Sequence, residues 1–144
     1  MQVDFYHLAG TSIEKVLPRL AERVLESGRL LIVAGEPALA TRLDAELWSY
    51  APDAFLPHGL AGEEGEGDQP VLISSATEAP NGARNVLIAD GLWREEALAF
   101  DRAFYLFDGA TIDGARAAWR ALGGREGIER RYWKREGERW REGP

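Results

Sequence analysis

Apolar residues along the chain follow two different spacings. Continuous apolar runs, the pattern of strands buried on both faces of a sheet, occupy residues 30–34, 85–89 and 103–107. Apolar residues three and four positions apart, the pattern of one helix face, mark residues 13–25, 37–48 and 111–122. Strands that alternate with helices predict βαβ units. We therefore predict an α/β protein, a three-layer α/β/α fold with a largely parallel, Rossmann-like open sheet.

Local signals predict where these elements begin and end. Thr11 and Glu14 have the spacing of a capping box, with Thr11 at the N-cap of the first helix. Pro18 lies inside that helix and is expected to kink it. Pro37 suits the first turn of the second helix. The glycine pair at 123–124 is expected to end the last helix.

Shorter segments complete the predicted order of elements. Weaker patterns predict strands at residues 3–7 and 71–74 and a short helix at residues 91–98. Residues 62–69, GEEGEGDQ, are acidic and glycine-rich, which favours a solvated, mobile loop. Aromatic and basic residues on both sides of Glu136 and Gly137 indicate a loose C-terminal hairpin.

Length and composition favour one soluble domain. The 144 residues are 45% hydrophobic and contain no cysteine, so we expect a substantial core without disulfides or thiolate metal sites. His7 and His58 are far apart in sequence, and we expect no metal site. No apolar run approaches about 20 residues and no signal peptide is recognisable. The expectation is a cytoplasmic domain over residues 1–144, with a basic C-terminal extension from about 124 to 144.

Charge is distributed unevenly along the chain, whose formal net charge is −7. Residues 115–144 hold nine basic and five acidic side chains, a net charge of +4. Residues 1–114 hold eight basic and nineteen acidic side chains, a net charge of −11. An acidic body repels nucleic acid, whereas a basic end attracts acidic ligands.

The sequence offers little for catalysis or nucleotide binding. Gly35 follows a strand and precedes a helix, but neither a dinucleotide fingerprint nor a phosphate-binding loop surrounds it. Ser74, Ser75, His58 and Asp44 could in principle supply a hydrolytic triad, yet the serines lack a nucleophile elbow. His58 is better interpreted as a structural ring that caps a turn. We expect no catalytic residue and no cofactor.

The segment from Thr41 to Gly62 carries the most distinctive pattern in the chain. It leaves the second helix through an aromatic-rich exit and reads RLDxxLWxxxxxxFLPHxLAGE from Arg42 onward. This spacing resembles the chi subunit of bacterial DNA polymerase III, an accessory protein of the clamp loader. The resemblance continues in the N-terminal DFYHL, in GRLLIVA and in the late ARAAWR. It implies a three-layer α/β fold, in agreement with the periodicity.

The resemblance also implies two contact surfaces. Trp48 lies off the apolar stripe of the second helix, where a side chain can meet a partner. In the family this region is implicated in contact with the psi subunit of the clamp loader, and the resemblance assigns that role to Trp48 and Phe55. The alternative is that Phe55 and Leu56 simply cover the edge of the sheet.

The late helix carries the second surface. Arg116, Trp119 and Arg120 share one face of it. Family members bind the acidic C-terminal tail of single-stranded DNA-binding protein, which ends in a phenylalanine carboxylate, and these three residues match the tail-binding positions. Ile112 departs from the pattern, because the family has a basic residue there. The alternative is a solvated helix face with Trp119 packed inward.

The predicted function is therefore that of a non-catalytic accessory subunit. It would bridge the clamp-loader complex, through a psi-like subunit, to the tail of single-stranded DNA-binding protein during DNA replication, and it would contact DNA only indirectly and no membrane. The alternative is a single-stranded nucleic-acid-binding module, in which Trp133 and Trp140 of the basic tail stack on bases. Acidic residues interspersed in the tail argue against that alternative.

Overall fold

The computed structural model describes residues 1–50 and 56–143. Its strands are β1 (Gln2–His7), β2 (Leu30–Val33), β3 (His58–Leu60), β4 (Val71–Ser74), β5 (Asn85–Ile88), β6 (Arg102–Phe107), β7 (Glu129–Glu136) and β8 (Arg139–Glu142). Its helices are α1 (Ile13–Leu25), α2 (Pro37–Ser49) and α3 (Ile112–Leu122), with 3-10 helices η1 (Glu66–Asp68) and η2 (Glu95–Ala99). No helix in this part of the chain is long and apolar enough to cross a bilayer.

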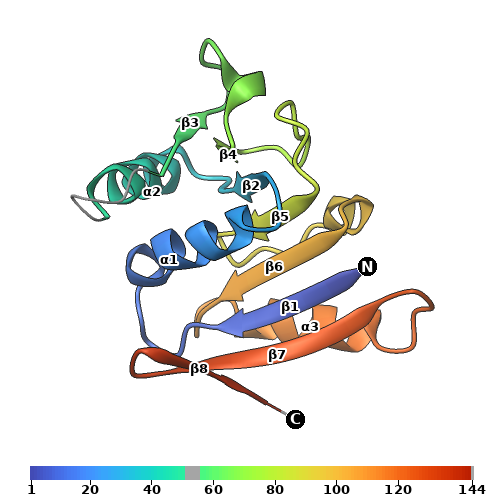
Figure 1. The fold of residues 1–144 in the computed structure, drawn as a ribbon. Coiled ribbons are helices and arrows are strands. Elements are labelled where there is room, and N and C mark those ends of the chain that lie inside the picture. The colour runs from blue at the N-terminus through green and yellow to red at the C-terminus, as the bar shows by residue number, and fades with distance from the viewer. Residues whose placement is uncertain (51–55, 144) are drawn as a thin grey trace.

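The strands form one sheet in the order β3-β4-β2-β5-β6-β1-β7-β8. The paired strands run parallel except β7 and β8, which are antiparallel. Helices α1 and α2 cover one face and α3 covers the other (Figure 1). The predicted three-layer, largely parallel α/β/α fold is confirmed.

Helices on both faces explain the continuous apolar runs. In β2, Leu30 and Ile32 pack beneath α1 and α2, whereas Leu31 and Val33 pack on the opposite side of the sheet. All four side chains have no solvent exposure. Because alternate residues of a strand face opposite sides, a strand covered on both sides needs apolar residues at every position.

Helix α1 begins differently from the prediction. Its N-cap is Ser12, whose side chain makes no capping hydrogen bond, so the predicted capping box of Thr11 and Glu14 is wrong. The Thr11 amide donates instead to the Leu8 carbonyl at 3.0 Å, which commits Thr11 to the preceding turn. Glu14 accepts a hydrogen bond from Arg42 of α2 at 3.1 Å. The helix continues past Pro18 to Leu25.

Two other predicted helix ends agree with the structure. Pro37 occupies the first turn of α2, and Gly123 is the C-cap of α3. The short helix predicted at residues 91–98 is a 3-10 helix that starts later, at Glu95. The segment 62–69, predicted to be a mobile loop, contains the 3-10 turn η1. There the Gly62 amide donates to the Glu66 carboxylate at 2.7 Å.

Strand β3 was not expected from the sequence. His58 lies opposite Val71 of β4, so the end of the Leu-Pro-His segment adds an edge strand to the sheet. The buried His58 ring contacts the Leu56 carbonyl through Nδ1 at 2.8 Å and the Asp44 carboxylate through Nε2 at 3.0 Å. These contacts join α2 to β3, which agrees with a structural role for His58.

The basic C-terminal residues extend the same sheet. β7 pairs in parallel with β1, and β8 returns along β7 as a hairpin. The turn lies between Glu136 and Arg139, one residue later than expected, and Gly137 has a positive φ of 60° there. The predicted hairpin is therefore confirmed, and it forms the edge of the sheet next to β1.

Gly91 offers a test of how α3 is positioned. Its φ is 76°, and a Cβ atom there would lie 2.4 Å from the hydroxyl of Thr111, the N-cap residue of α3. We expect Gly91→Ala to lower the free energy of unfolding by about 2–3 kcal/mol, measured by urea denaturation. Gly10 has a φ of 88° and open space around it, so Gly10→Ala should cost only about 1 kcal/mol. Equal losses would show that the contact with Thr111 does not constrain the fold.

Candidate functional site

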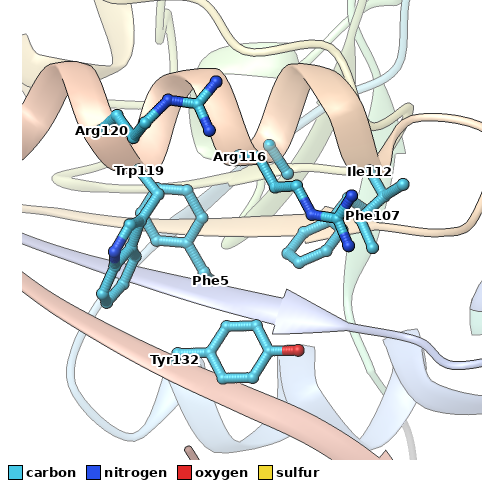
Figure 2. A pocket seen from close by; sticks show the side chains of 8 residues that line it. Phe5, Phe107, Ile112, Arg116, Trp119, Arg120 and Tyr132 are labelled. Atoms are coloured by element: carbon cyan, nitrogen blue, oxygen red, sulfur yellow. The ribbon is translucent and has the colours of Figure 1, made fainter. Parts of the chain in front are cut away.

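Helix α3 and three strands enclose a pocket of about 300 Å³. It is lined by Phe5, Phe107, Ile112, Ala115, Arg116, Trp119, Arg120 and Tyr132. Figure 2 shows the arginines on the helix and the rings of Phe5, Phe107 and Tyr132 on the strands below it. The structure therefore brings together Arg116, Trp119 and Arg120, the three residues predicted from the sequence.

Aromatic rings form the floor of the pocket. Trp119 meets Phe5 edge to face, with ring centroids 5.1 Å apart, and meets Tyr132 in the same way at 6.4 Å. The ring centroid of Phe107 lies 6.5 Å from that of Tyr132. Trp119 is only partly buried, so one part of the indole packs on the core and another part faces the pocket. A ligand ring could make the same edge-to-face contacts.

Sequence reasoning missed the strand residues of the pocket and the contact that fixes Trp119. The guanidinium of Arg130 lies 4.0 Å from the Trp119 ring centroid and donates a hydrogen bond to the Trp119 carbonyl at 2.6 Å. This carbonyl lies in the last turn of α3 and also accepts from the Gly123 amide at 3.2 Å, so Arg130 adds a charged donor at the C-terminal end of the helix. Alternation along 129–136 could have placed Arg130 and Tyr132 on one face, but only the β1–β7 pairing brings that face beneath α3.

The two arginines of α3 are available to an anionic ligand. The Arg116 guanidinium is 3.8 Å from the Asp113 carboxylate, but both side chains are largely exposed, at 64% and 97%. Exposed pairs of this kind contribute little free energy. Arg120 is exposed and forms no ion pair within residues 1–50 and 56–143. The pocket thus combines an apolar floor with a cationic rim.

His7 borders this pocket at the end of β1. Its ring stacks on Phe107 with centroids 5.1 Å apart, and its Nδ1 is 3.1 Å from the Tyr132 hydroxyl. Burial lowers the pKa of His7 below its ordinary value, and the positive charges of Lys134 and Arg116 lower it further. His7 is therefore mainly neutral at pH 7, and an anion bound beside it would raise its pKa.

The second predicted surface lies at the other edge of the sheet. Trp48 is 60% exposed on α2, and its ring lies 4.6 Å from the His58 ring. Phe55 lies outside the described residues. Leu56 is buried in the core. For Leu56 this agrees with the alternative interpretation, in which the segment covers the edge of the sheet. Edge strand β3 and helix α2 carry this surface, whereas β6, β1, β7 and α3 carry the pocket (Figure 1).

Of the residues considered for a hydrolytic triad, His58 and Asp44 meet, but Ser74 does not join them. Both nitrogens of the His58 ring are engaged, Nδ1 with the Leu56 carbonyl and Nε2 with the Asp44 carboxylate, so neither is free for a serine hydroxyl. Ser74 lies three residues beyond Val71, the partner of His58, which corresponds to about 10 Å of strand. Clusters of three or more His, Asp or Glu side chains suited to a metal ion are absent from residues 1–50 and 56–143.

These observations define an α/β domain of three layers that carries an aromatic and cationic surface pocket. Comparison with known proteins identifies the family. The family model of "DNA polymerase III chi subunit, HolC" matches residues 1–128. The chain belongs to this family.

Individual relatives agree with the family. The DNA polymerase III subunit chi of Escherichia coli K12 is 34% identical over 80 residues, which cover 55% of this chain and 54% of that protein. The subunit chi of Pseudomonas aeruginosa PAO1 is 34% identical over 91 residues, 60% of this chain and 62% of that protein. The matching segments thus span about half to three fifths of these relatives.

The lowered pKa of His7 predicts how stability depends on pH. Because the folded pKa lies below the unfolded value of about 6.5, the unfolded chain binds more protons as pH falls through that range. The contribution of His7 to the free energy of unfolding should therefore fall between pH 7.5 and 5.5, so over this range His7→Gln should lose less stability than the wild type. Urea denaturation at both pH values measures the difference. Identical pH dependence in the two proteins would contradict a lowered pKa of His7.

Proposed function

We propose that the protein is a non-catalytic accessory subunit of the DNA polymerase III clamp-loader complex. In this role it bridges the complex, through a psi-like subunit, to the acidic C-terminal tail of single-stranded DNA-binding protein. The relatives are named as subunits of DNA polymerase III, which supports the first part. The observation that carries the second part is the pocket of α3, with its aromatic floor beneath two exposed arginines.

The pocket suits a peptide that ends in an aromatic residue. The terminal ring would enter among Phe5, Trp119 and Tyr132, and its burial would contribute about 2 kcal/mol. The terminal carboxylate and the preceding acidic side chains would accept hydrogen bonds from Arg116 and Arg120, each contributing roughly 1.5–3 kcal/mol. After the cost of association, a dissociation constant on the order of micromolar results, and binding weakens as salt screens the charges.

Two weak contacts on one rigid sheet act together. Surface contacts to psi at α2 and to the tail at α3 would hold the polymerase near template coated with single-stranded DNA-binding protein. The second contact forms within an already tethered assembly, so its effective concentration is high. The protein then works in the cytoplasm, associated with the nucleoid through the replisome, and contacts DNA only indirectly.

Charge reversal on α3 tests the tail contact. We expect Arg116→Glu and Arg120→Glu each to weaken binding of an acidic peptide with a C-terminal phenylalanine by at least tenfold. Fluorescence anisotropy of a labelled peptide measures this. Arg19→Glu is the matched control, because Arg19 is an exposed arginine on α1, across the sheet from the pocket. Unchanged affinity in Arg116→Glu would refute the tail contact.

Truncation of Trp48 tests the psi contact. We expect Trp48→Ala to weaken capture of a psi subunit at least tenfold, because exposed tryptophans are frequent binding hot spots. Its thermal midpoint should stay within a few degrees of the wild type, since Trp48 is largely exposed. Leu47→Ala is the contrasting variant, because Leu47 is 2% exposed and its truncation should cost about 2–5 kcal/mol. Loss of folding in Trp48→Ala would instead place the indole in the core.

A further inference from the structure

The pairing register places two basic side chains of the hairpin in line with residues of the pocket. Phe107, His7, Lys134 and Arg141 lie directly opposite one another on β6, β1, β7 and β8. Residues opposite one another in neighbouring strands point to the same face of a sheet. Phe107 lines the pocket, so Lys134 and Arg141, the basic row of the hairpin, lie on the α3 face beside it.

The hairpin sorts its charges between its two faces. The residues of β7 and β8 on the α3 face are Arg130, Tyr132, Lys134, Glu136, Arg139 and Arg141, which are four cations and one carboxylate among six residues. Those on the α1 face are Glu129, Arg131, Trp133, Arg135, Trp140 and Glu142, where the charges balance. The basic character of the C-terminal segment is therefore concentrated on the side that carries the pocket.

Most cations of the α3 face remain available. Lys134, Arg139 and Arg141 are exposed. Arg141 lies 3.5 Å from the Glu136 carboxylate, but both partners are exposed and such a pair is weak. Burial is the largest cause of the lowered pKa of His7, and the charges of Lys134 of β7 and Arg116 of α3 lower that pKa further, whereas Asp108 raises it.

We propose that Lys134, Arg139 and Arg141 form a second subsite, which binds acidic side chains upstream of the terminal ring of the peptide. This inference rests on the proposed function of the pocket. Strands lie about 4.8 Å apart, so the row from His7 to Arg141 spans about 10 Å. An extended peptide covers that span with about three residues. The subsite lies within residues 129–142, beyond the 1–128 matched by the family model.

An acidic peptide fits this surface better than single-stranded nucleic acid does. Stacking of bases needs exposed aromatic faces beside the cations. The indoles of Trp133 and Trp140 lie on the opposite face of the hairpin, where they pack against the core beside Tyr6. The available cations instead continue directly from a pocket that accepts an aromatic ring and its carboxylate.

Two peptides separate the subsite from the pocket. One is a nine-residue peptide with several aspartates before a C-terminal phenylalanine, and the other is its last three residues with a single aspartate. We expect Lys134→Glu/Arg141→Glu to weaken binding of the long peptide roughly tenfold and of the short peptide less than twofold, by fluorescence anisotropy. Arg19→Glu/Arg131→Glu carries the same charge change on the α1 face and should leave both affinities unchanged. Lys134→Gln, a milder change, should weaken only the long peptide, about threefold.

The outcomes are distinct. Equal effects on both peptides, or none, in variants whose thermal midpoints match the wild type would overturn the subsite while leaving the pocket intact. Failure of the wild type to bind either peptide would overturn the proposed function and the subsite together. If the hairpin variants lost binding to a labelled oligothymidylate and kept the long peptide, the basic row would be a nucleic-acid site instead.

Discussion

The contact between Arg130 and Trp119 holds the pocket together. One guanidinium both covers the indole face and donates to the Trp119 carbonyl, so it ties strand β7 to the end of α3 across β1. A charge-assisted hydrogen bond contributes about 1.5–3 kcal/mol and a cation–π contact about 0.5–1 kcal/mol or more. Gly123 keeps this space open, because a Cβ atom there would lie 2.8 Å from the Arg130 guanidinium. The contact thus supports the position of α3, whose buried Ala115, Ala118 and Leu122 also pack on the sheet.

The sheet separates the two surfaces that the proposed function requires. From β3, beside Trp48, to β7, beneath the pocket, the strand order contains six intervals. At about 4.8 Å each, they correspond to about 30 Å. Two partners can therefore bind at once without sharing residues. A rigid sheet between them also fixes their relative position, which a flexible linker would not do.

Local sequence signals predicted the parts of the fold that depend on neighbouring residues. The runs at 30–34 and 85–89 revealed strands because helices cover both faces, and Gly123 ended α3 as expected. The N-cap of α1 was misjudged because Thr11 is held in a turn by Leu8, which no propensity reveals. Strand β3 was missed because its three residues are too few to show a period.

The candidate site shows the same division between local and nonlocal information. Arg116, Trp119 and Arg120 could be found because they lie one turn apart on one helix. Phe5, Tyr132 and Arg130 could not be assigned to the site, because they meet α3 only through the pairing of β1 with β7. In that pairing Phe5 lies opposite Tyr132, which is 127 positions away in sequence. The basic row of the hairpin likewise becomes visible only when the register sorts its two faces.

Chemical shifts in a nitrogen-labelled sample would test the central claim most directly. During titration with an acidic peptide that ends in phenylalanine, the account predicts the largest changes at the indole NH of Trp119 and at backbone amides of α3 and β7. The chemical shift of the indole NH of Trp48, which is about 30 Å away across the sheet, should not change. Largest changes at Trp48, or none at Trp119 under saturating peptide, would contradict the account.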